Sequence, residues 1–131
     1  MITKEITLCE QPVTLGYCYA TEIAYKDIAE EDIMEYAKHA IESIQAQRDP
    51  DIKRTIFAIL ACMMAFSHAN NQEPTITDVQ LMNEAKPMEI CLAIFAILEM
   101  RQQFYHVPAG EPKPKKGKGR TPKNPQPPTT I

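Results

Sequence analysis

Hydrophobic and polar residues alternate over the first seventeen positions of the chain. Ile6 and Leu8 fall on one side of a strand with Thr7 on the other, and residues 13–15 repeat this pattern. A period of two is typical of β-strands, so two short strands joined by a polar turn at residues 10–12 predict a hairpin. Because an isolated hairpin is marginally stable, we expect it to pack on the rest of the chain or to pair with another copy.

After Gly16 the apolar spacing changes from two to three or four. Residues 17–26 contain no proline or glycine and predict a short first helix. A second helix is predicted from Glu30 or Glu31, whose charge suits the positive end of a helix, to about Gln47. Its apolar stripe consists of Ile33, Tyr36 or Ala37, Ala40 or Ile41, and Ile44.

The next segment, residues 50–69, predicts a long helix that is apolar on most sides. Asp49-Pro50-Asp51 is its start signal, because Asp can cap free amides and Pro50 suits the first helical position. Polar residues 70–74 end this helix. Because it is apolar nearly all round, we expect it in the centre of a bundle or at a subunit interface.

Two further helices are predicted downstream. Thr77 and Gln80 resemble a capping box that opens a short helix, and Pro87 suits the first position of the last helix. One stripe of the last helix consists of Ile90, Ile94, Ile97, Met100 or Arg101, and Phe104, flanked by Cys91, Phe95 and Leu98. The expected fold is therefore mainly α, with an N-terminal β-hairpin followed by a small bundle of four to five helices.

Composition changes sharply at Pro108. Residues 108–131 contain seven of the eleven prolines and six Lys or Arg against the single Glu111. Subtracting their net charge of +5 from the whole-chain value of −3 leaves −8 on residues 1–107. A segment of such composition cannot bury a core. We therefore expect one folded acidic domain over residues 1–107 and a disordered, basic, Pro/Lys-rich tail over residues 108–131.

Charge and motifs argue against several function classes. The expected domain has sixteen Asp or Glu against eight Lys or Arg, which argues against a nucleic-acid-binding surface. His39, His68 and His106 fall in three different helices, and none of them has a second His or a Cys at the spacing of a zinc motif. The cysteines stand singly among apolar residues, as core thiols do. We therefore predict no enzymatic activity, no catalytic residue, no metal site and no cofactor.

The sequence also predicts no secretory signal and no membrane-spanning segment. The N-terminal residues lack the apolar core of a secretory signal and carry an early acid, Glu5. The longest uncharged run, residues 55–72, is strongly apolar only over residues 56–66, which is too short to span a bilayer. We therefore expect a cytoplasmic protein that does not associate with membranes.

Several features occur in a distinctive order along the chain. They are Ile6-Thr7-Leu8 and Val13-Thr14-Leu15 as a hairpin, the Tyr- and Ala-containing first helix at residues 17–26, Glu84-Ala85-Lys86-Pro87 at the start of the last helix, and a Lys/Pro tail. Over roughly residues 3–107, this layout resembles the small tail assembly chaperones of long-tailed bacteriophages and prophages.

The resemblance implies a non-enzymatic chaperone that coats the long, helical, aggregation-prone tape measure protein while tail tube subunits assemble around it. Such a protein would act as a homo-oligomer in the cytoplasm of the bacterial host cell and would be absent from the mature virion. In many relatives a programmed frameshift yields a longer product. Residues 114–118 suit a slippery codon run, and a nucleotide sequence without a slippery heptamer would remove this hypothesis.

Methionine and aromatic side chains are the candidates for partner binding. Methionines among the helices either supply an adaptable surface for a helical partner or fill gaps in the core. The predicted partner-binding residues are Tyr17, Tyr19, Tyr25, Met63, Met64, Met100 and Phe104.

The alternative is a small helical regulatory or nucleic-acid-binding protein. In this hypothesis, helices between Pro50 and Met100 form a helix-turn-helix and the basic tail binds phosphates. Only Lys53, Arg54 and Lys86 are basic in that region, and the two main helices are too apolar to lie in a DNA groove. We therefore favour the chaperone.

Overall fold

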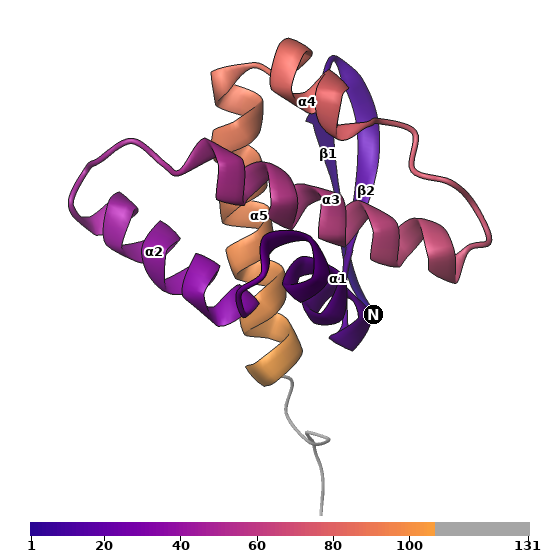
Figure 1. The fold of residues 1–131 in the computed structure, drawn as a ribbon, viewed down its shortest axis with the longest axis horizontal. Helices are drawn as coiled ribbons and strands as arrows, with labels where there is room; N and C mark the ends of the chain where they lie inside the picture. Colours follow the sequence, from indigo (N-terminus) through magenta and orange to yellow (C-terminus); the bar gives the residue numbers. More distant parts are fainter. Residues whose placement is uncertain (107–131) are drawn as a thin grey trace, which may run out of the picture.

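The computed structural model describes residues 1–106, which form a two-stranded hairpin followed by five helices (Figure 1). The mainly α fold predicted from the sequence is confirmed, and the predicted tail, residues 108–131, lies outside the described residues. The elements are β1 (Ile2–Leu8), β2 (Gln11–Tyr17), α1 (Tyr19–Ala29), α2 (Ile33–Gln45), α3 (Ile52–Ala69), α4 (Asp78–Glu84) and α5 (Pro87–His106).

Helices α3 and α5 cross near the centre of the molecule (Figure 1). The apolar helix α3 contacts all four other helices and also strand β2, while β1 packs along α5. This central position agrees with the expectation for a helix that is apolar on most sides. The largest fully buried side chains include Leu8, Leu15, Tyr17, Tyr25, Tyr36, Ile59, Met63, Ile97 and Met100.

The hairpin turn lies one position earlier than the sequence predicted. Leu8 pairs with Gln11, so the loop consists of only Cys9 and Glu10, whose φ angles are 52° and 64°. Two consecutive positive φ angles are typical of a type I′ turn, which Asn-Gly usually forms. Pro12 belongs to β2 instead, where it lies opposite Thr7. The predicted turn at residues 10–12 is therefore wrong.

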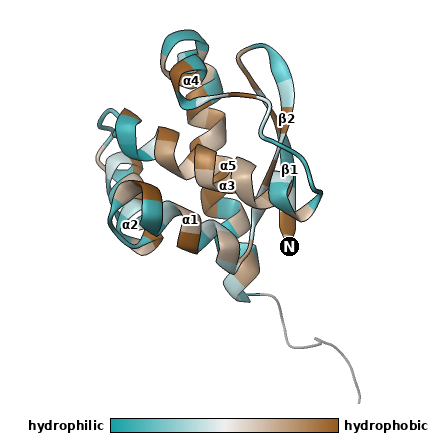
Figure 2. Cartoon of the chain, turned by 45° about the vertical axis from the view of Figure 1, so that its right-hand side comes forward, coloured by the Kyte–Doolittle hydropathy of each residue, from teal (hydrophilic) through white to brown (hydrophobic). Residues whose placement is uncertain are grey.

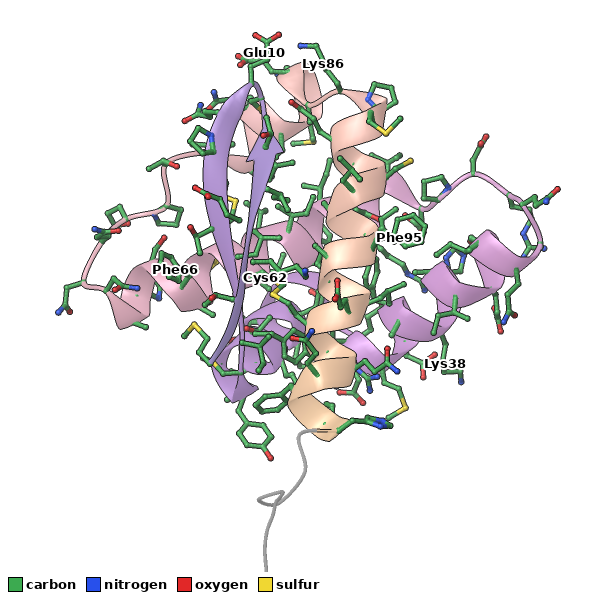
Figure 3. All side chains as sticks on the ribbon, turned by 180° about the vertical axis from the view of Figure 1, so that it is seen from behind. Glu10, Lys38, Cys62, Phe66, Lys86 and Phe95 are labelled. Atoms are coloured by element: carbon green, nitrogen blue, oxygen red, sulfur yellow. The ribbon has the colours of Figure 1, made fainter. Side chains whose placement is uncertain are left out.

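A buried carboxylate explains how this unfavourable turn is held. Glu89, near the start of α5, accepts hydrogen bonds from the backbone N–H groups of Cys9 at 2.9 Å and Glu10 at 3.1 Å. It also accepts the N–H of Lys86 at 3.0 Å, which caps α5. Above it, the Lys86 ammonium lies 2.6 Å from the Glu10 carboxylate (Figure 3). We call this arrangement the Glu89 clamp, and it fastens the turn to the first turn of α5.

The first two helices begin later than predicted. Tyr17 is the last residue of β2, and α1 begins at Tyr19, where the Thr21 hydroxyl accepts the N–H of Cys18 at 3.1 Å. Glu30 adopts a left-handed φ of 59° and ends α1, so α2 cannot begin there. Instead, α2 begins at Ile33. Since a left-handed residue interrupts the helical hydrogen bonds, the acids near residue 30 belong to the connection.

The start signals of the later helices are largely confirmed. The Thr77 hydroxyl accepts the N–H of Gln80 at 3.1 Å, and Pro87 is the first residue of α5. For α3, Asp51 of the predicted Asp49-Pro50-Asp51 start signal is the cap, because its carboxylate accepts the N–H of Arg54 at 3.1 Å. The helix begins at Ile52, so Pro50 is not its first residue.

Candidate functional site

The titratable side chains of the described residues form no reactive cluster. Within residues 1–106, no group of three or more His, Cys, Asp or Glu is arranged to hold a metal ion. His39, His68 and His106 lie in α2, α3 and α5. Cys62 is fully buried, and its burial raises the pKa of the thiol, which disfavours the nucleophilic thiolate.

Tyrosine hydroxyls are bound to carboxylates at the edges of the core. Tyr17 and Tyr105 both donate to Glu22, the former at 2.9 Å, and Tyr25 donates to Glu31 at 2.6 Å. The hydrogen bond to Glu22 raises the pKa of Tyr105 to about 12, and burial raises the pKa of Tyr17 and Tyr25. These phenols therefore remain protonated donors with a structural role.

The predicted partner-binding residues do not form one surface. Four of them are core residues, because their side chains are at most 2% exposed: Tyr17, Tyr25, Met63 and Met100. Met64 and Phe104 are half-buried, and Tyr19 is 66% exposed. The fold does bring Phe104 against Tyr17 and Tyr19, with ring centroids 5.5 and 5.0 Å apart.

A larger exposed surface lies on the opposite side of α5 from its core stripe. Met88 is 68% exposed, and Leu92 and Phe95 are each 55% exposed. Exposed side chains from α2, the start of α3 and α4 add to it. We call this set the apolar surface; it consists of Ile41, Ile44, Ile52, Met82, Met88, Leu92 and Phe95. Figure 2 shows hydrophobic positions along both α3 and α5.

Two hollows run between α2 and α5 within this surface, and we call them together the α2–α5 groove. The first, of about 170 Å³, lies between Ile44 and Phe95, and the second, of about 460 Å³, lies between Ile41 and Tyr105. Figure 3 shows Phe95 on the side of α5 that faces α2.

A third hollow, of about 480 Å³, lies at the end of the groove near α4. It shares Pro50 and Cys91 with the first hollow and is lined by Met82 of α4. The three hollows therefore follow α5 from its first turn to its last. A groove of this length, apolar in its first and third hollows and partly polar in the second, can accept an amphipathic helix.

Small side chains on α2 explain why the groove stays open. Ala37 and Ala40 are buried on the side of α2 that faces the bundle, and they line the two hollows. Tyr36 fixes α2 to α3 instead, with its hydroxyl 3.3 Å from that of Thr55. Because alanines cannot bridge to α5, Ile41 and Ile44 remain as exposed walls.

The sequence contains apolar residues that indicate this surface but lie outside the stripe predicted for the last helix. Apolar residues on α5 extend beyond the stripe, since Met88 and Leu92 repeat at helical spacing on the other side. On α2, the predicted stripe allows Ala40 or Ile41 and includes Ile44; Ala40 is the buried alternative, whereas Ile41 and Ile44 are exposed. A helix with apolar residues on both sides contains more of them than a small bundle can cover.

The length and composition of helix α3 suit both a core helix and a membrane-spanning helix. Among the described helices it is the one that is long and apolar enough to cross a membrane by length and composition, with a mean hydropathy of 1.3. Half of the residues of this helix are buried inside the fold. Core helices of globular proteins have the same combination of length and composition, so this is weak evidence for a membrane span.

Comparisons of the chain with protein-family models, curated proteins and solved structures found no match.

Proposed function

We propose that this protein is a non-enzymatic tail assembly chaperone of a phage or prophage. It binds apolar helical segments of the tape measure protein and keeps them from aggregating while the tail tube assembles. The observation that supports this proposal is the apolar surface, in which seven large side chains from four helices are exposed. Three of them, Ile41, Ile44 and Phe95, line the α2–α5 groove.

The dimensions of the groove suit a helical partner. Helix α5 has 20 residues, which corresponds to a length of about 30 Å. A partner helix lying along it would present apolar residues at every third or fourth position over several turns. Burial of apolar area from both sides is the main source of affinity in such complexes.

A long partner with repeated apolar stripes also favours several copies of the chaperone. Each shallow groove binds one short segment, and linked copies raise the effective concentration of the next groove. The homo-oligomer implied by the resemblance to tail assembly chaperones would serve this purpose. The tail tube protein is the second partner that the resemblance implies.

Co-expression with the tape measure protein encoded nearby tests the proposal. Wild-type chain should raise the soluble fraction of the tape measure protein, and Leu92→Glu should abolish this effect because it places a charge in the apolar surface. Ile23→Glu is the matched control, because Ile23 is a 63% exposed aliphatic residue on α1, outside that surface.

The control also distinguishes between two possible binding surfaces. If Ile23→Glu abolishes the effect and Leu92→Glu does not, the partner binds near Tyr19 on α1, and our assignment of the surface is wrong. If wild-type chain leaves the tape measure protein insoluble, the proposed function itself is wrong.

A further inference from the structure

We propose that the segment bound in the α2–α5 groove is an acidic amphipathic helix, with an apolar face and two carboxylates that pair with Arg48 and Arg101. This inference rests on the proposed function, since it specifies the chemistry of the partner helix. It follows from the charges in the groove, which differ from those of the surrounding surface.

The groove contains two arginines that have no acidic partner within residues 1–106. Arg48 lines the first hollow beside Phe95, and Arg101 lines the second. The ion pairs of the described residues instead engage Lys4, Lys26, Lys38, Arg54 and Lys86. Both arginines are therefore available to a carboxylate from outside.

Arg101 in particular has a hydrogen-bonding capacity that the described residues leave unused. Its guanidinium stacks on the ring of Tyr105, 5.2 Å from the ring centre, and its Nε is buried without an acceptor among residues 1–106. The Tyr105 hydroxyl already donates to Glu22. A carboxylate in the second hollow would lie beside a planar donor group that is well suited to bidentate binding.

The charge of the rest of the domain strengthens the contrast. Residues 1–107 carry a net charge of −8, yet neither of the two hollows between α2 and α5 is lined by an Asp or Glu. A basic partner would meet two positive charges here. A second copy of the chain would bring another acidic domain against this one, which long-range repulsion opposes. Charge complementarity therefore favours an acidic helix from a different protein.

The positions of the arginines define the spacing of the carboxylates. Arg48 and Phe95 line the same hollow, and Arg101 lies six residues after Phe95 on α5, about 9 Å further along the helix axis. Positions seven residues apart lie on the same side of a helix. The partner should therefore carry acids at positions i and i+7, next to apolar residues at positions between them.

Two synthetic peptides test this proposal on the full-length chain. Both form an amphipathic helix with one apolar face, and they differ only by Glu or Gln at positions i and i+7. Fluorescence anisotropy at low salt should show about tenfold tighter binding of the Glu peptide, since two partly exposed ion pairs together contribute about 1.4 kcal/mol. The double variant R48Q/R101Q should remove this preference and should bind both peptides equally.

The control variant is K4Q/K26Q, which loses the same two positive charges outside the groove. It should keep the tenfold preference for the Glu peptide. The basic residues beyond Pro108 are the same in the wild-type chain and in both double variants. If K4Q/K26Q loses the preference as fully as R48Q/R101Q does, the effect arises from net charge and the proposal is wrong. Circular dichroism of each variant verifies that it is folded.

Two other outcomes would overturn the proposal. Equal affinity of the wild-type chain for the two peptides would exclude a role for the carboxylates, whereas rescue of the tape measure protein by co-expression would still support the proposed function. Failure of both peptides to bind, together with a dimer that Phe95→Glu dissociates in analytical ultracentrifugation, would show that a second copy occupies the groove.

Discussion

The two sides of α5 consist of the same kinds of residue but have opposite environments. Ile90, Ile94 and Ile97 are at most 5% exposed, while Met88 and Leu92 on the other side are more than half exposed. Strand β1 and helix α3 pack against α5, whereas Met88 and Leu92 are left without cover by residues 1–106. The comparison shows that the apolar pattern of a helix specifies how much surface needs a partner, but not which side the fold itself covers.

The largest expected loss of stability comes from a substitution on the covered side of α5. Ile97→Ala removes a side chain that is 1% exposed and leaves a cavity in the core. We expect a loss of about 3 kcal/mol in the free energy of unfolding, measured by urea denaturation. A loss below about 1 kcal/mol would mean that the two sides of α5 are packed alike, and the comparison would fail.

The second largest effect concerns the Glu89 clamp, the polar part of the covered side. Glu89→Gln keeps the size of the side chain but loses the negative charge that three backbone N–H groups share. We expect a loss of about 2 kcal/mol in the free energy of unfolding. Glu99→Gln is the control, because Glu99 is an exposed residue of α5 that pairs with Lys4. An equal loss in both variants would refute the clamp.

The clamp should also show a defined dependence on pH. The N–H group of Lys86, followed by those of Cys9 and Glu10, holds the pKa of Glu89 below its usual value. A lowered pKa in the folded state stabilises the protein fully above the unfolded pKa of about 4.3, and this contribution is lost as pH falls through the folded pKa. The difference in stability between wild type and Glu89→Gln should therefore be constant near neutral pH and shrink below about pH 4. A difference that does not change with pH would contradict the shift.

The smallest expected loss of stability comes from a substitution on the open side of α5. Leu92→Ala removes a side chain that the described fold does not cover, so the free energy of unfolding should change by less than about 0.5 kcal/mol. The same variant should weaken capture of the tape measure protein in the co-expression assay. A thermal denaturation that shows a loss above about 1.5 kcal/mol would indicate that the open side is already covered in the isolated protein.

Helix starts illustrate what local sequence predicts well. Thr77 and Pro87 mark the starts of α4 and α5 because a cap and a first-turn proline act on backbone groups a few residues away. The start of α2 was predicted too early, since acids at residues 30 and 31 suit a helix start but the left-handed backbone of Glu30 ends α1. Local patterns therefore identify the helices better than they identify every boundary.

The candidate site was less accessible to sequence analysis. Residue type alone makes aromatic and methionine side chains the candidates for partner binding, yet Tyr17, Tyr25, Met63 and Met100 are buried. Their side chains are large and apolar, so they stabilise the core as readily as they would a complex. Met100 and Phe104 of the last helix are among the predicted partner-binding residues, but the period of apolar residues alone does not distinguish the open side of this helix from its covered side.

The sequence by itself determined the order and type of the elements, because strand and helix periods and helix caps depend on residues a few positions apart. Only the tertiary structure decided the position of the hairpin turn, the role of Glu89 and the open side of α5. The reason is that these features depend on residues far apart in the sequence. The hydrogen bond from Cys9 to Glu89 joins residues 80 positions apart, and the α2–α5 groove exists only where two helices from different parts of the chain meet. Contacts of this kind leave no periodic signal in the chain, although they set which apolar residues remain for a partner.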